Sequence, residues 1–302
     1  MNQQLLSAAS SGDLSEVELL LTRGASTDAR DCDNNNPLHN AASNGYTEVV
    51  ELLLRKDASV KARNKQNQTP LHCAAHSGHI RVAEVLLARG APIEDGKYYR
   101  NPQDGLGLRR RRLYAKIHAF QYMRTPLHEA ARGGHIDVME LLLNNGALIS
   151  ALDSAENTPL LVAASCGHRG MVELLLNNGA SPHDTNVLDK TSLFFAASGG
   201  HTSVVELLLT KGVSVEAAGD SGVAPLNVAA MEGHRGVVEL LINNGASFTD
   251  MGSNGKTPLE LARAGGHHDI AELLLDKFFQ PPRERERRPP RRNYNIGRRG
   301  RR

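Results

Sequence analysis

The sequence predicts an all-α repeat solenoid, and three observations carry that prediction. A Pro-Leu motif recurs along most of the 302 residues, at a spacing that is constant except at one point. An alanine pair or a close variant follows each motif, and a Gly-His type pair comes next. An apolar block such as VVELLL then leads to a Gly-Ala pair. Because one such unit cannot bury its apolar surface alone, we expect each repeat to be stabilised by stacking on its neighbours.

Six prolines and one serine mark the period. The marks read NPLH, TPLH, TPLH, TPLL, TSLF, APLN and TPLE, at Pro37, Pro70, Pro126, Pro159, Ser192, Pro225 and Pro258. Every step between marks is 33 residues except the second, which is 56. Since 56 is 33 plus 23, one insertion of 23 residues accounts for the break.

The residues around each mark predict the first of two helices. Thr caps the helix, and Pro takes its first position, where the missing N–H costs nothing. The small alanine pair lets helices of neighbouring repeats approach closely. Gly78, Gly134 and Gly200 end this helix, at a position where a positive φ is expected. Ala224 in place of Thr and Ser192 in place of Pro weaken two helix starts, each by about 1 kcal/mol or less.

The VVELLL block predicts the second helix of each repeat. Its residues are apolar around most of the helix circumference, as expected for a helix that other repeats cover on both sides.

The repeat resembles the ankyrin repeat. The segment TPLHEAARGGHIDVMELLLNNGA, which opens residues 125–157, lies close to that family's consensus, and the resemblance extends from about Gln3 to Lys277. It implies stacked helix-turn-helix repeats over residues 1–279, with β-turn fingers along one edge and a loop inserted at about 94–120. Eight repeats are expected, the first without its leading turn, with starts near residues 3, 36, 69, 125, 158, 191, 224 and 257.

The finger turns test this register. The residue two positions before the Thr is usually Gly in the family, and residues tolerant of a positive φ hold it here in five repeats: Asn34, Asn67, Asp189, Gly222 and Gly255. Glu156 fits the turn less well and Met123 fits it badly. We therefore expect the insertion to enter the finger of the fourth repeat and to rebuild its turn.

Thirteen histidines raise the question of a metal or catalytic site. Nine hold repeat positions, where the resemblance implies hydrogen bonds within or between adjacent repeats: His39, His72, His128, His79, His135, His168, His201, His234 and His267. Equivalent histidines of stacked repeats lie about 10 Å apart, too far to share a metal ion with ligand bonds of about 2 Å. No nucleophile elbow, Walker loop, HExxH or kinase motif is present. The sequence thus predicts no catalytic residue, no metal site, no cofactor and no enzyme.

The resemblance implies that a protein partner is bound by the finger tips and the concave face. The positions that correspond to this surface are Lys65, Gln66, Gln68, His76, Tyr122, Arg124, Arg132, Asn157, Val187, Leu188, Lys190, Met231 and Glu232. Small helix residues beneath Val187, Leu188 and Val223 predict a shallow apolar hollow over repeats five to seven, the alternative being ordinary surface scatter.

Charge is strongly segregated along the chain. Residues 280–302 hold ten arginines and two glutamates, a balance of +8, although the net charge of the whole chain is only +2. The stretch 94–124 has a balance of +5, which leaves −11 for the rest. The sequence therefore predicts an acidic body with two basic appendages.

The first appendage contains GLRRRRLYAKIHAF, with four consecutive arginines at Arg109, Arg110, Arg111 and Arg112. Its apolar residues fit both a helical and a strand spacing, so its conformation stays open. Arginines cannot be buried unpaired. Three interpretations of these arginines are open: they contact a phosphate or an acidic partner, they pair with the acidic body of the chain, or they remain solvated.

The second appendage, residues 280–302, is predicted to be disordered because it is rich in Arg and Pro and nearly free of apolar residues. Three of its arginine pairs are the candidate contacts: Arg287, Arg288, Arg291, Arg292, Arg298 and Arg299. Because the guanidinium fork binds phosphate bidentately, attachment to nucleic acid or an acidic partner is one interpretation. Nuclear import and a solubilising or intramolecular cover are the others.

The remaining features define the functional classes. No signal peptide or membrane-spanning run is seen, and three cysteines without paired spacing are typical of a reducing compartment, so the cytoplasm or nucleus is expected. The leading hypothesis is a non-enzymatic adaptor, monomeric within a hetero-complex and not bound to a membrane. One alternative is an RNA-associated or ribonucleoprotein subunit that holds phosphates with the two basic segments. Another is the substrate-recognition subunit of a ubiquitin ligase-type complex.

Overall fold

The computed structural model describes residues 1–96, 123–217, 223–252 and 255–279. Sixteen helices are found in these ranges, and they form two layers. The inner layer contains the first helix of each repeat: α1 (Asn2–Ser11), α3 (Pro37–Asn44), α5 (Pro70–Ser77), α8 (Pro126–Gly133), α10 (Pro159–Cys166), α12 (Ser192–Ser198), α14 (Pro225–Glu232) and α16 (Pro258–Ala264). The outer layer contains the second helices: α2 (Leu14–Thr22), α4 (Thr47–Arg55), α6 (Ile80–Ala88), α9 (Ile136–Asn144), α11 (Arg169–Asn177), α13 (Thr202–Thr210), α15 (Arg235–Asn243) and α17 (His268–Phe279).

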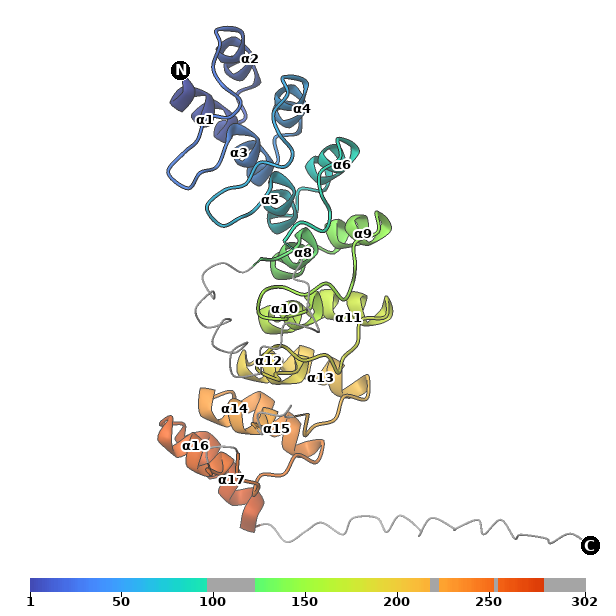
Figure 1. The fold of residues 1–302 in the computed structure, drawn as a ribbon. Helices are drawn as coiled ribbons and strands as arrows, with labels where there is room; N and C mark the ends of the chain where they lie inside the picture. Colours follow the sequence, from blue (N-terminus) through green and yellow to red (C-terminus); the bar gives the residue numbers. More distant parts are fainter. Residues whose placement is uncertain (97–122, 218–222, 253–254, 280–302) are drawn as a thin grey trace, which may run out of the picture.

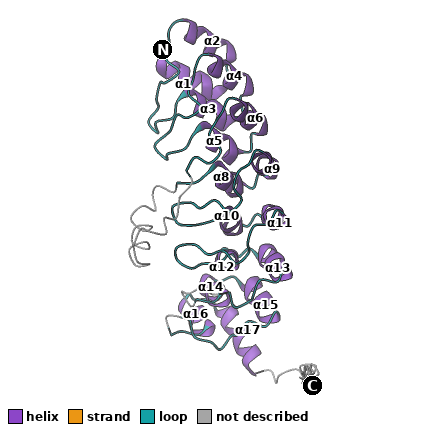
Figure 2. Ribbon diagram, turned by 45° about the vertical axis from the view of Figure 1, so that its right-hand side comes forward, coloured by secondary structure: helices purple, strands orange, loops and turns teal. Residues whose placement is uncertain are grey.

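The helix pairs stack into one elongated array with α1 and α17 at opposite ends (Figure 1). The loops between repeats project past the inner layer as fingers, and the outer helices line the opposite side (Figure 2). The all-α repeat solenoid predicted from the period is therefore confirmed. No described helix has the length and apolar character that crossing a membrane requires.

The inner helices begin where the marks predict. Thr125 is the N-cap of α8, and Pro126 is the first helical residue. The Thr125 hydroxyl lies 2.8 Å from His128 Nδ1, and the Thr125 backbone N–H donates to the same ring nitrogen at 3.2 Å. Thr69 and His72 pair in the same way at the start of α5. At α14 the N-cap is Ala224, which offers no side-chain hydrogen bond.

The predicted small and apolar positions form the core. The alanine pairs of the inner helices are fully buried, as at Ala74–Ala75 and Ala163–Ala164. The outer helices bury their valines and central leucines, for example Val82 and Leu86 in α6. Each layer is thus packed by the layers before and after it, as a chain of nearest-neighbour contacts.

The finger turns adopt the left-handed backbone expected of them. Asn34, Asn67, Glu156 and Asp189 have φ values between 57° and 62°. In the described part of the interrupted finger a positive φ is found at Gly96, with φ of 84°, and not at Met123. A Cβ atom added to Gly96 would collide with the Arg124 carbonyl. The chain entering the insertion therefore lies against the chain leaving it.

Histidine hydrogen bonds tie neighbouring repeats together. His39 Nε2 donates to Gln68 O at 3.0 Å, His72 Nε2 to Arg124 O at 2.7 Å, and His128 Nε2 to Asn157 O at 2.9 Å. In a second set of histidines, each lies just after the inner helix of its own repeat. The Nε2 atom donates to a carbonyl in the last turn of the inner helix of the previous repeat, at 2.9–3.0 Å: His79, His135, His168, His201, His234 and His267. The structural role expected for these nine histidines is confirmed.

The insertion does not interrupt this network. The carbonyl acceptors of His39 and His128 lie 29 residues further along the chain, and that of His72 lies 52 residues further. The difference is 23, the length of the insertion. His72 Nε2 also lies 3.2 Å from Asp95 O, so its ring contacts both ends of the interrupted finger. Repeats three and four therefore stack as the other neighbours do.

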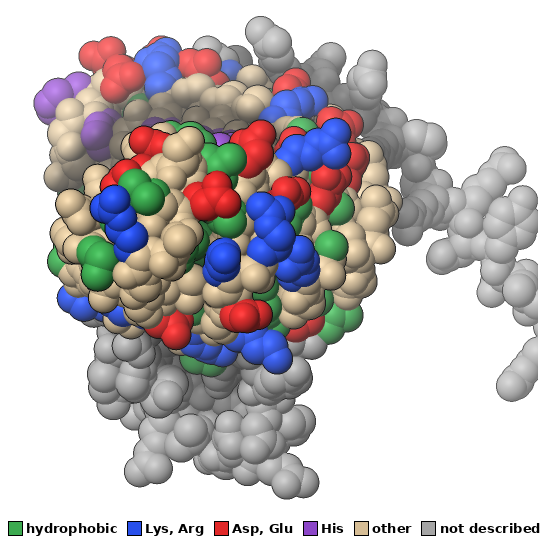
Figure 3. Space-filling view, turned by 90° about the horizontal axis from the view of Figure 1, so that it is seen from above, with side chains coloured by type: hydrophobic (Ala, Val, Ile, Leu, Met, Phe, Trp, Pro, Cys, Tyr) green, Lys and Arg blue, Asp and Glu red, His purple; other side chains and the backbone are tan. Residues whose placement is uncertain are grey.

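Charged groups are interspersed on the end of the stack. Seen along the solenoid from the N-terminal repeat, acidic and basic side chains alternate and hydrophobic side chains lie among them (Figure 3). Neither acidic nor basic side chains predominate in this view.

Candidate functional site

A buried carboxylate distinguishes the inner face of repeat four. Glu129, in α8, is 2% exposed. The same position holds an uncharged residue in the other complete repeats: Asn40, Cys73, Val162, Phe195, Val228 and Leu261. A buried carboxylate is costly unless it is paired, so its partners define the site.

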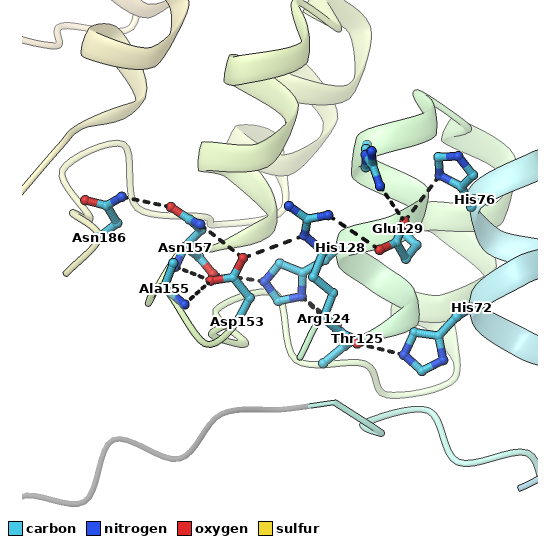
Figure 4. Close-up of polar contacts among 11 residues, drawn as sticks. His72, His76, Arg124, Thr125, His128, Glu129, Asp153, Ala155, Asn157 and Asn186 are labelled. Atoms are coloured by element: carbon cyan, nitrogen blue, oxygen red, sulfur yellow. Dashed lines mark hydrogen bonds and ion pairs between the residues drawn. The ribbon is translucent and has the colours of Figure 1, made fainter. Parts of the chain in front are cut away.

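Three cationic or titratable side chains surround Glu129. His76 Nδ1, from α5, lies 3.2 Å from Glu129 Oε2. Arg124 Nη1 lies 3.8 Å from Oε1, and Arg132 Nη1 lies 3.8 Å from Oε2. Figure 4 shows Glu129 between the preceding repeat, which supplies His76, and Arg124 at the end of the interrupted finger.

These neighbours keep Glu129 ionised. Burial alone would raise the pKa of the Glu129 carboxyl. The hydrogen bond from His76 and the charges of Arg124 and Arg132 outweigh burial and hold that pKa below its usual value. Glu129 is therefore an anion at neutral pH.

Arg124 links this carboxylate to a second one. Its Nε lies 3.7 Å from Oδ2 of Asp153, which is fully buried at the base of the next finger (Figure 4). Asp153 Oδ1 accepts the backbone N–H groups of Ala155 at 2.9 Å and Asn157 at 2.8 Å, which shapes that finger. Backbone N–H groups of its own finger thus fix the Asp153 carboxylate, and this carboxylate positions Arg124.

In two of the other fingers a short amide, Asn35 or Asn157, holds the position of Arg124. Asn64 Nδ2 donates to Asn35 Oδ1 at 2.9 Å, and Asn186 Nδ2 donates to Asn157 Oδ1 at 3.1 Å. These amide pairs connect the bases of adjacent fingers. At the interrupted finger the connection is made by a long cationic side chain instead.

A cavity of about 220 Å³ opens beside Arg124 and Arg132, and we call it the arginine pocket. Its walls come from repeats four, five and six: Arg124, Arg132, Asn157, Leu161, Val162, Ser165, Cys166 and Phe195. Two guanidinium groups, an amide and a hydroxyl supply the polar part, and three large apolar side chains and a cysteine supply the rest. No acidic residue of the described chain lines it. Such a wall can hold an anionic group and an apolar group at the same time.

Three residues expected at the partner surface line the arginine pocket: Arg124, Arg132 and Asn157. Gln66 and Gln68 line a second, largely polar hollow of about 270 Å³ over repeats two and three. His76 lies in the Glu129 cluster and is exposed.

The other expected residues lie apart from both cavities. Lys65 is exposed on its finger. Lys190 Nζ lies 4.3 Å from the centre of the Phe194 ring. Met231 and Glu232 are exposed at the end of α14.

The residues expected to form an apolar hollow over repeats five to seven do not line the arginine pocket. Val187 is only 6% exposed, because its finger folds back and the Val187 N–H donates to Ala155 O at 3.0 Å. The expectation that Val187 is an exposed fingertip residue is therefore wrong. Leu188 and Val223 are half-buried, and neither lines the arginine pocket, which lies over repeats four to six.

Sequence reasoning missed Glu129, Asp153 and Phe195. Glu129 could have been found by aligning the repeats, since it is the acid in a column of uncharged residues. The burial of Asp153 gives no such signal, because Asp31 holds the equivalent position and is half-buried.

Several expected residues lie outside the described ranges. They are Tyr122, the insertion arginines 109–112 and the arginines of residues 280–302. Their predicted contacts with a partner or with phosphate stay predictions.

The site offers little for covalent chemistry. Burial raises the pKa of Cys73 to about 12, so the thiol beside the Glu129 cluster is protonated. The described residues bring no three His, Cys, Asp or Glu side chains together as metal ligands would be. What the groups provide is hydrogen-bond donors, positive charge and apolar surface.

Comparison with known proteins agrees with the architecture. Residues 5–96, 111–186 and 193–285 match a family model described as "Ankyrin repeats (3 copies)", and residues 170–209 match one described as "Ankyrin repeats (many copies)". The matched ranges include more than half of the chain. Such repeats generally mediate protein–protein binding and are typically non-enzymatic. No curated protein matches the sequence.

Proposed function

Because the chain belongs to the ankyrin-repeat family, we propose that it is a non-enzymatic adaptor whose inner face binds a protein partner, with the arginine pocket inside the contact. The observation that carries the proposal is the pocket itself. It combines a half-exposed arginine of repeat four with apolar side chains of repeats five and six. Protein interfaces are enriched in arginine and aromatic residues at their centres, where water is excluded.

The test is to fill the pocket and measure partner capture. Ser165 is exposed and lines the pocket, so Ser165→Arg occludes the cavity without disturbing a buried side chain. Ser203→Arg, on the outer helix α13, adds the same side chain away from the inner face. Proteins that bind the full chain from extract are expected to be lost with Ser165→Arg and retained with Ser203→Arg. Retention with both variants counts against the pocket.

Leu188→Arg and Met231→Arg extend the test along the inner face. Both residues stand at positions expected to contact the partner, and Met231 is 42% exposed. Loss of the partner with either variant means that the contact reaches repeats six and seven. Light scattering of the purified chain checks the proposed monomeric state. Fractionation of cells checks the proposed cytoplasmic or nuclear location.

A second function is favoured by the arginines of the two basic segments. Ten arginines in residues 280–302, together with Arg109–Arg112, would neutralise several phosphates of RNA while the inner face holds protein. Binding is then expected to weaken as salt rises, with a slope in log–log form of about −0.7 for each phosphate contacted on a single strand.

Nuclease treatment separates the two functions. Partners that disappear after nuclease and after removal of residues 280–302 support the RNA-associated function. Partners that resist nuclease and disappear with Ser165→Arg support the adaptor. Ligase subunits among these resistant partners would make the chain a substrate-recognition subunit, which is a special case of the adaptor.

A further inference from the structure

Arg132 presents N–H donors to the arginine pocket that no residue of the described ranges uses. The Arg132 side chain is 49% exposed, and its ion pair with Glu129 is 3.8 Å long, beyond the 2.7–3.2 Å of a hydrogen bond. No hydrogen bond joins the Arg132 guanidinium to any residue in the described ranges. A guanidinium carries five N–H donors in a planar fork, so Arg132 can bind an oxygen anion through two of them.

The negative charges of the site lie behind the positive ones. The Glu129 and Asp153 side chains are 3% and 0% exposed, and neither lines the cavity. Arg124 and Arg132 do line it. A group that enters the cavity therefore meets cations first, while the carboxylates hold these cations in place. Arginines held in position lose less conformational freedom when a ligand arrives, which strengthens binding.

The rest of the wall and the size of the cavity define the occupant further. Leu161, Val162 and Phe195 supply apolar surface within the same cavity. The volume of about 220 Å³ lies below the roughly 300–1,000 Å³ of small-molecule sites. A pair of side chains of a protein segment fits such a cavity better than a whole cofactor does.

We propose that the arginine pocket recognises a protein segment in which an Asp or Glu side chain stands beside a large apolar side chain. The carboxylate binds the fork of Arg132 next to Arg124, and the apolar side chain packs on Val162 and Phe195. This inference rests on the proposed adaptor function and adds the chemical class of the bound segment. Charge-assisted bidentate pairs of this kind give both affinity and geometric specificity.

The test begins with random 12-residue peptides displayed on phage and selected against the full chain. Selected sequences are expected to contain Asp or Glu within three residues of Leu, Ile, Val, Met or Phe, and not to bind Ser165→Arg. The best peptide is then synthesised with an amidated C-terminus, together with a copy in which the acid is replaced by its amide. The amide copy is expected to bind about 10- to 100-fold more weakly.

The assignment to Arg132 is tested by a double-mutant cycle. Arg132→Gln is expected to weaken the acidic peptide by a similar factor and the amide peptide much less, and Arg132→Lys to recover part of the loss. Arg235→Gln is the matched control, since that arginine is 47% exposed on the outer helix α15. It is expected to change nothing.

Each contrary result has its own meaning. Peptides that depend on the pocket but bind equally well as amides overturn the acidic class and leave the adaptor function standing. Displacement of the peptide by 10 mM inorganic phosphate with no effect of the amide substitution assigns the pocket to phosphate and likewise overturns the inference. Peptides that bind Ser165→Arg unchanged, or no enrichment over that variant, remove both the inference and the pocket from the proposed function.

Discussion

Glu129 is the residue that sets repeat four apart, because it places a buried negative charge where other repeats have an uncharged side chain. Its charge is balanced by Arg124, whose side chain is only 18% exposed, and by the more exposed Arg132, while His76 Nδ1 lies 3.2 Å from the carboxylate. Removing one partner of a buried pair leaves the other charge uncompensated. The stability of the site therefore depends on the Glu129 charge itself.

Glu129→Gln keeps the shape of this side chain and removes its charge. We expect a loss of about 2 kcal/mol in the free energy of unfolding, less than for a fully buried pair, since Arg132 and His76 reach water. Urea unfolding of the full chain measures it. Glu140→Gln, at an exposed position of α9, is the control and should stay within about 0.5 kcal/mol of the wild type. Equal losses for the two variants would contradict the pairing.

The buried histidines make stability depend on pH. Burial lowers the pKa of His39 to about 4, from 6.5 for an unperturbed side chain, and it also lowers the pKa of His72 and of His128. Between pH 6.5 and 4 the unfolded chain binds a proton that the folded His39 does not. The free energy of unfolding therefore falls as pH falls through this window.

For His39 alone the expected loss at pH 5 is about 2 kcal/mol relative to pH 7.5. Thermal or urea unfolding at the two pH values measures it. His39→Gln should lower stability at pH 7.5, since Gln cannot reproduce both ring hydrogen bonds, but it should reduce the further decline toward pH 5. A decline as steep as that of the wild type would show that His39 is not the titrating group.

At this scale the sequence predicted part of the site. Arg124, Arg132 and Asn157 were placed at the partner surface by their repeat positions, and they line the arginine pocket. The pairing of Arg124 with Asp153 could not be predicted, because it depends on a side chain that crosses from one finger to the next. Val187 was misplaced because the backbone of its finger folds against the preceding finger.

The helix starts show how well local chemistry explains the elements. Each inner helix after the first begins at its predicted mark, and four of these helix starts close a capping box: α3, α5, α8 and α16. In three of these boxes a histidine takes the role that Glu or Gln has in the usual box. The exception in capping is α14, whose Ala224 cannot accept a hydrogen bond from the helix.

Ala224→Thr should repair that helix start. Ala224 already has the extended backbone of a cap, with φ of −66° and ψ of 152°, so Thr can accept the Asn227 N–H without rearrangement. We expect stabilisation by about 1 kcal/mol. Thermal unfolding of the full chain measures it. Thr158→Ala, which removes a cap from α10, is the converse variant and should cost a similar amount; a gain from both variants would rule out capping as the cause.

The interrupted finger is the element that local chemistry predicted least. The poor fit of Met123 to the turn predicted an insertion in this finger, and among the described residues of the finger the positive φ is found at Gly96. That Gly96 lies against Arg124 could not be deduced, because the two residues are separated by the whole insertion.

The whole molecule is held together by contacts between successive layers. Comparing two glycines separates the effect of one such contact from the effect of backbone strain. Gly78 and Gly90 have nearly the same φ, 79° and 78°. A Cβ added to Gly78 would collide with the His135 ring of the next repeat, whereas none of the described atoms lies within 4 Å of a Cβ added to Gly90. The two positions therefore share backbone strain and differ in the interlayer contact.

Gly90→Ala should cost about 1 kcal/mol, the strain of a left-handed alanine. Gly78→Ala should cost clearly more, by about 2 kcal/mol, because the ring must move and its 2.9 Å hydrogen bond to His76 O is lost. Urea unfolding compares the two variants. In a one-dimensional stack this loss should also weaken the coupling of repeats three and four, so the transition should broaden for Gly78→Ala. Equal costs and equal slopes would mean that the histidine contact does not couple the layers.

The hydrogen bonds across the interrupted finger have a consequence for how this protein can change. His72 and His135 bridge 52 and 59 residues with bonds of 2.7 and 2.9 Å, close to the 2.9 Å of the bonds from His128 and His168, which bridge 29 and 36 residues. The stacking of repeats three and four thus does not depend on the segment inserted before Arg124. A change of sequence between Gly96 and Met123 therefore leaves the donors and acceptors that join repeats three and four in place. The stacking of these two repeats and the sequence of the insertion can vary independently.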